Sequence, residues 1–284
     1  MSRVRVFAWA ATSALLLSGL AGPGAADDGS PRRVVSMNLC TDQLAMLVAA
    51  PGQLVSVSYL AQDPSASAMV EEAQAYGTNR GLAEEIFMIE PNLVIAGTFT
   101  TRATVGLLRR LGVPLVEFAP ANGLEDVRDR LAQMGAVLGR EAAAAHLIAD
   151  FDAGLAELRV GEGARPQAAT YYANNYTSGT GTLASAVIEA AGLDNLADEL
   201  GITGGGRLAL ETLVTEAPDL VITGRQFETP ALAQEVLTHP ALAALQDRAG
   251  TAPVADRDWI CGTPHVLAAI RRLAAARDAV LDRR

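Results

Sequence analysis

Two cysteines and a histidine are the residues of this 284-residue chain whose types most directly suggest chemistry. Cys40 and Cys261 lie 221 positions apart, and His265 follows Cys261 by four residues. In an oxidising compartment, a lone pair of cysteines is expected to form a disulfide. Alternatively, the two thiolates, with His265 as a further donor, contact the metal of a ligand. Two inert thiols are the third interpretation, and the residues alone leave all three open.

An exported enzyme is an alternative that the same residues allow. A Cys40 nucleophile with His265 as its base would be chemically sufficient. No motif supplies an oxyanion hole or a third orienting group, so the sequence favours a protein that is not an enzyme. A binder of free zinc or manganese usually needs several histidines and carboxylates, whereas the three histidines here are scattered. The composition gives no positive sign of a structural or adhesion module.

A segment that carries a glutamate occurs twice. Glu84 precedes Pro91 by seven residues, and Glu211 precedes Pro218 by seven. An Asn/Asp-Leu-Val-Ile-x-Gly stretch follows each proline, and the prolines lie 127 residues apart. Two such copies indicate two similar lobes, with a cleft between them. The simpler interpretation is that both glutamates are first-turn charges, which the helix dipole favours.

The first residues are typical of an export signal. Arg3 and Arg5 precede an apolar run over residues 6–20, and small residues follow at 24–26. This pattern predicts a signal peptide over residues 1–26 and a soluble, periplasmic protein. The run is short for a membrane anchor.

Charge and composition exclude several classes of function. The formal net charge is −10, and removal of two arginines with the signal peptide would make it −12. So acidic a chain is not expected to bind nucleic acid. All 22 basic residues are arginine, so a P-loop lysine and a lysine Schiff base are both excluded. We therefore expect no cofactor.

Alternation of strands and helices predicts an α/β fold with parallel-sheet cores. Twenty residues at 141–160, with Gly154 as the single interruption before the end, predict a long helix that connects the lobes. The N-terminal lobe then covers 27–140 and the C-terminal lobe 161–284. We expect the lobes to rock slightly rather than close widely. Other predicted strands are 33–37, 54–58, 92–96, 113–118, 168–173 and 251–255, and other predicted helices are 41–50, 102–111 and 263–282.

Together these features resemble the periplasmic binding proteins of metal-chelate ABC importers, which carry cobalamin, ferric siderophores or haem. The resemblance runs from about Arg33 to the C-terminus. Its most specific parts are the two glutamate segments and the stretch from Gly181 to Leu196. It implies a monomer that binds a metal chelate between its lobes. It also implies that Glu84 and Glu211 dock onto arginines of the permease dimer.

Within that family, the chain looks most like the cobalamin-binding branch. Tyr59 follows the second strand, where the resemblance implies a cleft aromatic. Asp258 and Trp259 lie in a predicted loop before the last helix, where it implies an Asp-Trp pair that contacts a corrinoid. The resemblance thus implies cobalamin or another corrinoid, with a ferric siderophore or haem as the alternative. Trp259 could instead be a core residue.

The loops after the two repeated strands supply further candidate ligand contacts. Phe99 with Arg102, and Arg225 with Phe227, follow those strands and could clamp carboxylate or amide groups. Open α/β sheets bind ligands at the carboxyl ends of their strands, where these loops emerge. Tyr176 could also point into the cleft. Together with its neighbouring tyrosines, it leaves an iron-phenolate interpretation open.

Overall fold

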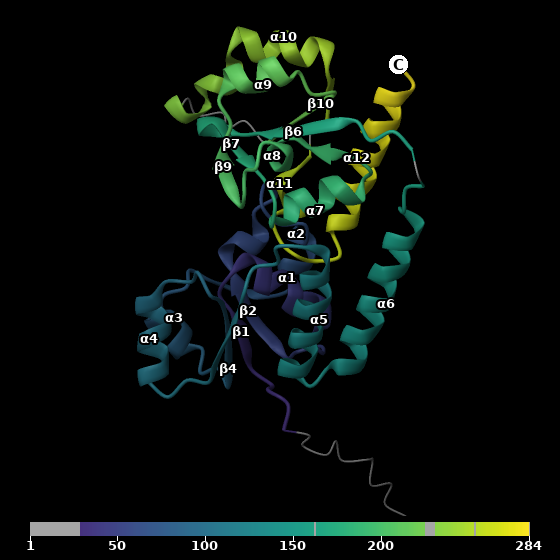
Figure 1. The fold of residues 1–284 in the computed structure, drawn as a ribbon. Coiled ribbons are helices and arrows are strands. Elements are labelled where there is room, and N and C mark those ends of the chain that lie inside the picture. Colours follow the sequence, from purple (N-terminus) through teal and green to yellow (C-terminus); the bar gives the residue numbers. More distant parts are fainter. Residues whose placement is uncertain (1–28, 162, 225–230, 253, 284) are drawn as a thin grey trace, which may run out of the picture.

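Two lobes, each built on a parallel sheet, lie one above the other in the computed structural model (Figure 1). The structure describes residues 29–283, except 162, 225–230 and 253. The predicted signal peptide, residues 1–26, lies outside the described residues. The two parallel sheets confirm the predicted α/β fold class.

The N-terminal lobe has a five-stranded sheet in the order β3-β2-β1-β4-β5, with every pairing parallel. Adjacent residues of a strand point to opposite faces, so Val34 and Val35 enter different cores. Helices α1 and α5 cover one face, and α3 and α4 cover the other. The elements are β1 (Val34–Ser36), α1 (Leu39–Val48), β2 (Leu54–Ser58), η1 (Tyr59–Gln62), α2 (Val70–Ala73), β3 (Gly77–Asn79), α3 (Ala83–Met88), β4 (Leu93–Gly97), α4 (Arg102–Arg110), β5 (Leu115–Phe118) and α5 (Leu124–Leu138).

The C-terminal lobe has a four-stranded parallel sheet in the order β11-β10-β6-β8, with an antiparallel β7–β9 pair beside it. Helices α7 and α12 cover one face, and α9 and α10 cover the other. The elements are β6 (Gln167–Tyr171), η2 (Ala173–Asn175), β7 (Tyr176–Ser178), α7 (Leu183–Ala190), β8 (Asp194–Asn195), α8 (Leu196–Glu199), β9 (Gly205–Arg207), α9 (Leu210–Glu216), β10 (Leu220–Thr223), η3 (Leu232–Thr238), α10 (Pro240–Arg248), β11 (Gly250–Thr251), α11 (Asp256–Trp259) and α12 (Val266–Leu281).

The repeated segment has the same backbone course in both lobes. Helix α3 leads into β4, and helix α9 leads into β10. The residue before each proline has a left-handed backbone, with φ 51° at Glu90 and 47° at Ala217. Non-glycine residues rarely adopt this conformation, and here it reverses the chain from helix to strand.

A polar side chain locks each repeated strand to its neighbour. Asn92 Oδ1 accepts a hydrogen bond from the backbone nitrogen of Arg33 at 3.0 Å. Asp219 Oδ2 accepts one from the backbone nitrogen of Gln167 at 2.8 Å. These bonds set the start of β1 against β4 and of β6 against β10, and so align the carboxyl ends of the strands.

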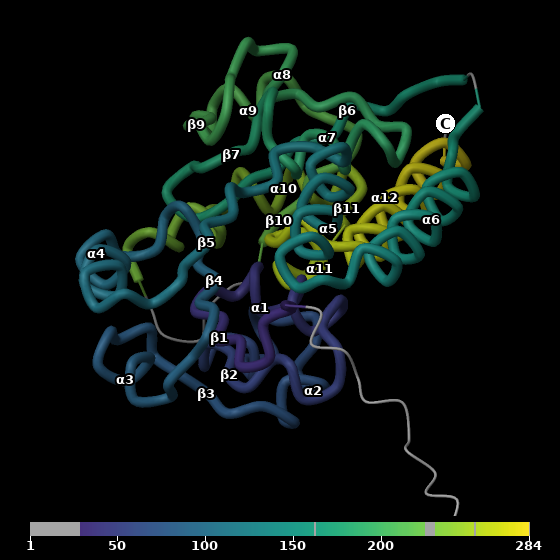
Figure 2. The backbone as a smooth tube through the Cα atoms, turned by 90° about the horizontal axis from the view of Figure 1, so that it is seen from below, coloured from purple at the N-terminus to yellow at the C-terminus, as the bar shows by residue number. Residues whose placement is uncertain are grey.

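Helix α6 (Glu141–Glu157) runs along the side of the molecule and joins the two lobes (Figure 1). Its 17 residues span about 26 Å. It lies beside α12 in both views (Figure 2). Gly154 permits this approach, because a Cβ there would lie 2.6 Å from Leu267 Cδ1.

One hydrophobic core runs through both lobes. Buried residues of β1, β4, α1 and α5 belong to the same cluster as those of β6, β10, α7 and α12. Phe151 of α6 is also part of it. A shared core resists wide separation of the lobes, which is consistent with the small rocking motion that we expect.

Several predicted elements differ in detail from those observed. Helix α12 begins at Val266 rather than Thr263, because the residues between them form a turn and His265 is the N-cap. Strand β11 is confined to Gly250–Thr251. Strand β3 and the β7–β9 pair were not predicted, since short, glycine-rich strands give a weak alternation signal. The lobe boundaries at 140 and 161 stay predictions.

A disulfide joins Cys40, in the first turn of α1, to Cys261, in the segment between α11 and α12. The two Cα atoms lie 5.1 Å apart, although the residues are 221 positions apart in sequence. The bond ties the segment ahead of the last helix to the N-terminal lobe. It uses the thiols that a metal-contact or nucleophile role would require.

We expect the unreduced protein to show no free thiol when titrated under denaturing conditions. The Cys40→Ser/Cys261→Ser variant should lose about 2–4 kcal/mol of unfolding free energy, because the long loop is no longer closed in the unfolded chain. Urea unfolding measures the loss, and reduced wild-type protein should match the variant. Two titratable thiols per chain would contradict the disulfide.

Candidate functional site

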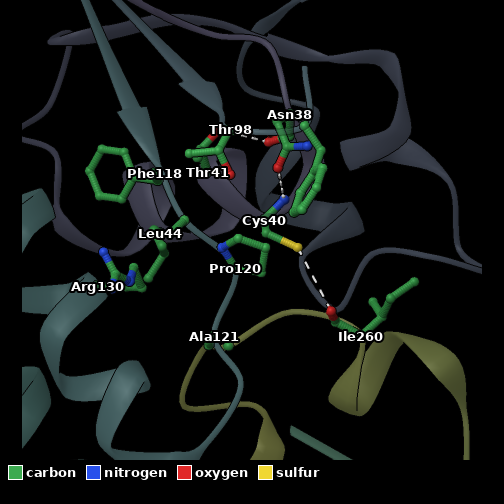
Figure 3. A pocket seen from close by; sticks show the side chains of 14 residues that line it. Asn38, Cys40, Thr41, Leu44, Thr98, Phe118, Pro120, Ala121, Arg130 and Ile260 are labelled. Atoms are coloured by element: carbon green, nitrogen blue, oxygen red, sulfur yellow. Dashed lines mark hydrogen bonds between the residues drawn. The ribbon is translucent and has the colours of Figure 1, made fainter. Parts of the chain in front are cut away.

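A cavity of about 140 Å³ lies at the carboxyl ends of β1, β4 and β5 (Figure 3). We call it the N-lobe cavity. Its wall is formed by residues that follow those strands and by the start of α1, and Ile260 and Gly262 close it from the other lobe. It is lined by residues that include Asn38, Thr41, Leu44, Phe99, Phe118 and Arg130.

The start of α1 positions the polar wall of this cavity. Asn38 is the N-cap of the helix, and its Oδ1 accepts a hydrogen bond from Cys40 N at 3.1 Å. Thr41 Oγ1 donates to Asn38 O at 2.9 Å. The Asn38 bond pairs a backbone N–H that the first turn of a helix otherwise leaves unpaired, and it helps to hold Cys40 in place for the disulfide.

A second cavity, of about 400 Å³, lies at the carboxyl ends of β6 and β10. We call it the C-lobe cavity. Its lining is mainly apolar and includes Tyr172, Leu237, Asp256, Trp259 and Ile260. Ile260 is 56% exposed and lines both cavities. The two cavities therefore adjoin one segment, next to the disulfide, and together define the candidate cleft.

Contacts between the lobes surround this segment. Cys40 Sγ lies 3.9 Å from the carbonyl oxygen of Ile260. A disulfide sulfur carries no proton, so this is a packing contact rather than a hydrogen bond. Arg257 Nη1 donates to the carbonyl oxygen of Pro64 at 3.2 Å. Helix α11 of the C-terminal lobe thus touches the region after η1 of the N-terminal lobe.

The predicted loop placement of Asp258 and Trp259 is wrong, because both belong to the short helix α11. Trp259 is 6% exposed and packs in the shared core, with one side on the C-lobe cavity. Asp258 is buried and forms an ion pair with Arg272 of α12. The carboxylate therefore has a structural partner, and the indole is as much a core residue as a wall of the cavity.

Of the other predicted ligand contacts that the structure describes, Phe99 lines one of the two cavities, whereas Tyr59, Arg102 and Tyr176 line neither. Phe99 is 88% exposed and lines the N-lobe cavity. Arg102 is exposed at the first position of α4, and it is not part of either lining. Tyr59 is exposed directly after β2. Arg225 and Phe227 lie outside the described residues.

Tyr176, at the first position of β7, is also exposed. The neighbouring tyrosines, Tyr171 and Tyr172, are less exposed. Tyr171 is buried, and burial, with a smaller effect of Glu211, raises the pKa of its hydroxyl to about 12. Burial, assisted by Asp256, also raises the pKa of Tyr172. Raised values oppose the phenolate form, so these two tyrosines are poor candidates for iron ligands at neutral pH.

His265 occupies the N-cap position of α12, close to the disulfide, but its side chain makes no capping hydrogen bond. Burial lowers its pKa, and the charges of Glu72 and Asp258 oppose that effect. Its Nε2 is buried without a hydrogen-bond partner. The part of the chain that the structure describes contains no group of three or more His, Cys, Asp or Glu side chains that could hold a metal ion. With both sulfurs in a disulfide, His265 lacks the thiolate partners that its predicted metal role needs.

Asp42, one turn into α1, is a buried carboxyl that the sequence did not single out. Its Oδ2 accepts hydrogen bonds from Ser58 N at 3.1 Å and Ser58 Oγ at 2.5 Å. Desolvation outweighs these bonds and raises the pKa of the carboxyl to about 6. Ser58 is the last residue of β2, so this contact fixes the backbone that presents Tyr59.

Sequence reasoning also missed Arg130 of α5, whose guanidinium lies at the N-lobe cavity (Figure 3). Its Nη1 donates to Gln133 Oε1 at 2.6 Å, while its buried Nε has no partner. An arginine spaced as part of an amphipathic helix looks like a surface residue. Only the packing of α5 against the sheet turns it toward the cavity.

The two repeated glutamates occupy equivalent positions. Glu84 is the second residue of α3, and Glu211 is the second residue of α9. Both side chains are exposed. Ile86 and Leu213, two residues further on, are fully buried and anchor the helices to their sheets.

Two similar α/β lobes with a ligand cleft at the carboxyl ends of their strands define a substrate-binding protein. The family model described as periplasmic binding protein matches residues 34–249. The chain belongs to the periplasmic binding protein family, which confirms the family that the sequence predicted. Members of this family bind metal chelates and work with ABC transporters.

A cobalamin-binding protein of Halobacterium salinarum is 31% identical over 208 residues, which are 69% of this chain and 55% of that protein. The chain therefore spans about half the length of this curated relative. The periplasmic heme-binding protein RhuT of Roseiflexus superposes with a TM-score of 0.69 at 21% identity, over 87% of this chain and 99% of that one. HutB of Vibrio cholerae, another periplasmic heme-binding protein, superposes with a TM-score of 0.69 at 19% identity, over 86% of this chain and 97% of that one.

At such low identities, the two solved structures support the fold alone. Among the described residues, no helix is both long and apolar enough to cross a membrane.

The raised pKa of Asp42 predicts a specific pH dependence. Its folded value, about 6, exceeds the ordinary 3.8, so its contribution to stability is full below pH 4 and is lost as the pH rises through 6. Between pH 7 and pH 5, the wild type should gain about 1 kcal/mol of unfolding free energy that Asp42→Asn does not gain. Urea unfolding at both values measures this, with the exposed Asp129→Asn as control. An equal pH response of Asp42→Asn and wild type would contradict the assignment.

Proposed function

We propose that this protein captures a corrinoid, cobalamin or a close relative, in the periplasm and delivers it to the permease of an ABC importer. The observation that carries the proposal is the 31% identity to a cobalamin-binding protein over 69% of this chain. The family match covers residues 34–249, which include the whole sheet of the N-terminal lobe and β6, β8 and β10 of the C-terminal lobe.

The cleft has the chemistry that a large, flat chelate requires. The C-lobe cavity presents Tyr172, Leu237 and Trp259, and the N-lobe cavity adds Phe99 and other apolar groups. Apolar walls with few polar groups suit a macrocycle whose faces are apolar and whose edges are polar. The shared core and the disulfide hold the two walls in a fixed relation, which lowers the entropy lost when a ligand binds.

The chain acts as a receptor rather than as an enzyme. The disulfide leaves no thiol among the described cysteines for nucleophilic attack. Among the described lining residues, Asn38 and Thr41 form hydrogen bonds at the first turn of α1 and Arg130 binds Gln133, and no hydrogen bond there joins a nucleophile to a base of the kind that catalysis requires.

Delivery to the permease depends on the exposed Glu84 and Glu211. They project from the same position of equivalent helices, one on each lobe, so a permease dimer can bind one with each subunit. This arrangement needs a single copy of the receptor, and we propose that it is a monomer. Neither carboxylate has an ion-pair partner within the part of the chain that the structure describes.

Titration with coloured chelates tests the ligand. We expect cyanocobalamin or dicyanocobinamide to bind with a Kd of about 1 µM or lower, seen as a spectral shift or by calorimetry. Hemin and a ferric siderophore are the comparison ligands, and each should bind more weakly. Tight binding of hemin or of the siderophore, without corrinoid binding, would show that the corrinoid assignment is wrong and that the chelate that binds is the ligand. The absence of binding to every chelate would overturn the receptor function.

Charge reversal tests the docking role. The Glu84→Arg/Glu211→Arg variant should abolish corrinoid uptake by cells that express the importer, because it would repel the permease arginines. Its ligand Kd should equal that of the wild type. Glu157→Arg/Glu216→Arg makes the same charge change at two exposed helix ends and should leave uptake intact. Uptake that survives the first variant would contradict docking through these glutamates.

A further inference from the structure

An arginine lies over an exposed tyrosine ring in each lobe. In the N-terminal lobe, the guanidinium carbon of Arg80 is 5.6 Å from the ring centre of Tyr59. In the C-terminal lobe, the guanidinium carbon of Arg207 is 6.0 Å from that of Tyr176. The tyrosines are 52% and 48% exposed, so each pair is open to solvent on one side. Neither pair serves the core.

Duplication explains the arginines but not the tyrosines. Arg80 and Arg207 lie 127 residues apart, the same offset as the repeated prolines, and each precedes its glutamate by four. Tyr59 and Tyr176 lie 117 residues apart, so they are not copies of one position. Tyr59 follows β2, whereas Tyr176 pairs directly with Arg207 in the antiparallel β7–β9 pair. The same Arg–Tyr contact has thus arisen by two different backbone routes, which indicates a shared requirement.

In the N-terminal lobe, the pair lies outside the lining of the N-lobe cavity but at the same end of the sheet, at the carboxyl ends of β2 and β3. Arg80 directly follows β3, and Tyr59 directly follows β2. Both strands run parallel to β1 and β4, whose carboxyl ends line the N-lobe cavity. Asn79 fixes this edge, because its buried Nδ2 donates to Ser36 O at 2.8 Å.

In the C-terminal lobe, the pair is tied to the C-lobe cavity through Tyr172. Tyr172 lines that cavity, and its backbone nitrogen donates to Tyr176 O at 2.8 Å. The turn between them holds Asn174 and Asn175 at φ 58° and 60°, in the left-handed region. Strained conformations of this kind persist where the surrounding structure imposes them, and they cluster at ligand sites. Here the turn presents the Tyr176 ring to Arg207.

Both guanidinium groups are available for an anion. No ion pair or side-chain hydrogen bond engages either of them within the described part of the chain. Glu85, five residues further on, accepts a hydrogen bond from the backbone nitrogen of Arg80 at 2.7 Å rather than from its guanidinium. Stacking on a tyrosine orients a guanidinium and leaves its N–H fork free for a carboxylate. The chain as a whole is acidic, with a formal net charge of −10, so two unpaired and oriented guanidinium groups favour a ligand that carries acidic groups.

We propose that Arg80 on Tyr59 and Arg207 on Tyr176 form two anion clamps, one on each lobe, that bind acidic groups at the edge of the chelate. Within the proposed corrinoid class, the preferred ligand is one whose peripheral side chains end in carboxylates rather than amides. This inference rests on the proposed receptor function and narrows its ligand class. Each guanidinium pairs with one acidic group through parallel hydrogen bonds.

The test compares an acidic and a neutral form of the same ring. The probes are dicyanocobyrinic acid against dicyanocobinamide, and hemin against its dimethyl ester, each titrated by calorimetry at low salt. The wild type should bind the acidic form of at least one pair about a hundredfold more tightly. Arg80→Gln and Arg207→Gln should each reduce that ratio about tenfold, and the double variant should bring it close to one. The neutral probes should keep their affinity.

Matched variants separate a clamp from a general charge effect. Arg110→Gln/Arg159→Gln removes two exposed arginines elsewhere and should leave the ratio unchanged. Tyr59→Phe and Tyr176→Phe keep the aromatic ring and should keep the ratio of acidic-probe to neutral-probe affinity. Tyr59→Leu and Tyr176→Leu remove the ring and should lower that ratio. A ratio that stays at the wild-type value in either single arginine variant overturns the clamp of that lobe.

The outcomes also distinguish the clamps from the corrinoid function. Absence of any preference for an acidic form in the wild type, in both ring systems, overturns the clamps. Corrinoid binding with no such preference leaves the proposed function intact. An Arg80- and Arg207-dependent preference for hemin over its ester, without corrinoid binding, supports the clamps and rejects the corrinoid function.

Discussion

The covalent bond between Cys40 and Cys261 is the constraint on which the geometry of the cleft depends. It fixes the segment after α11 against the start of α1, so that Ile260 lies between the two cavities. The continuous core beneath it, through α6 and α12, holds the sheets from the other side. A cleft held in this way has little freedom to collapse when empty, and its two walls are already in place when a ligand arrives.

The duplicated unit supplies both the framework and its asymmetry. In each copy, a short helix, a left-handed residue before proline and a polar lock on the neighbouring strand recur at the same offset. These features determine where strand ends lie, and so where loops project. The loops themselves differ, because residues after a strand end are free of the packing that fixes the strand. One lobe contributes a small cavity with a polar wall, and the other contributes a larger, apolar one.

Charge is distributed unevenly in this acidic protein. The two repeated helices expose the carboxylates of Glu84 and Glu211, while Arg80 and Arg207 lie at strand ends of the two lobes. An acidic surface disfavours nonspecific capture of anions, and the proposed arginine clamps would supply local affinity for an anionic ligand. Buried Asp42 contributes structurally instead, since it binds the residue that precedes Tyr59.

The sequence by itself determined the α/β class, the two lobes, the connecting helix and the family, because periodicity, the proline-anchored repeat and helix length are local properties of the chain. It also brought out Glu84 and Glu211, whose positions follow from that repeat. Only the tertiary structure decided that the cysteines pair, that Asp258 binds Arg272, and that Trp259 belongs as much to the core as to the cleft. It alone placed Arg80 over Tyr59 and Arg207 over Tyr176. The physical reason is that these contacts join residues far apart in the chain or on neighbouring strands, and packing rather than local sequence sets their distance.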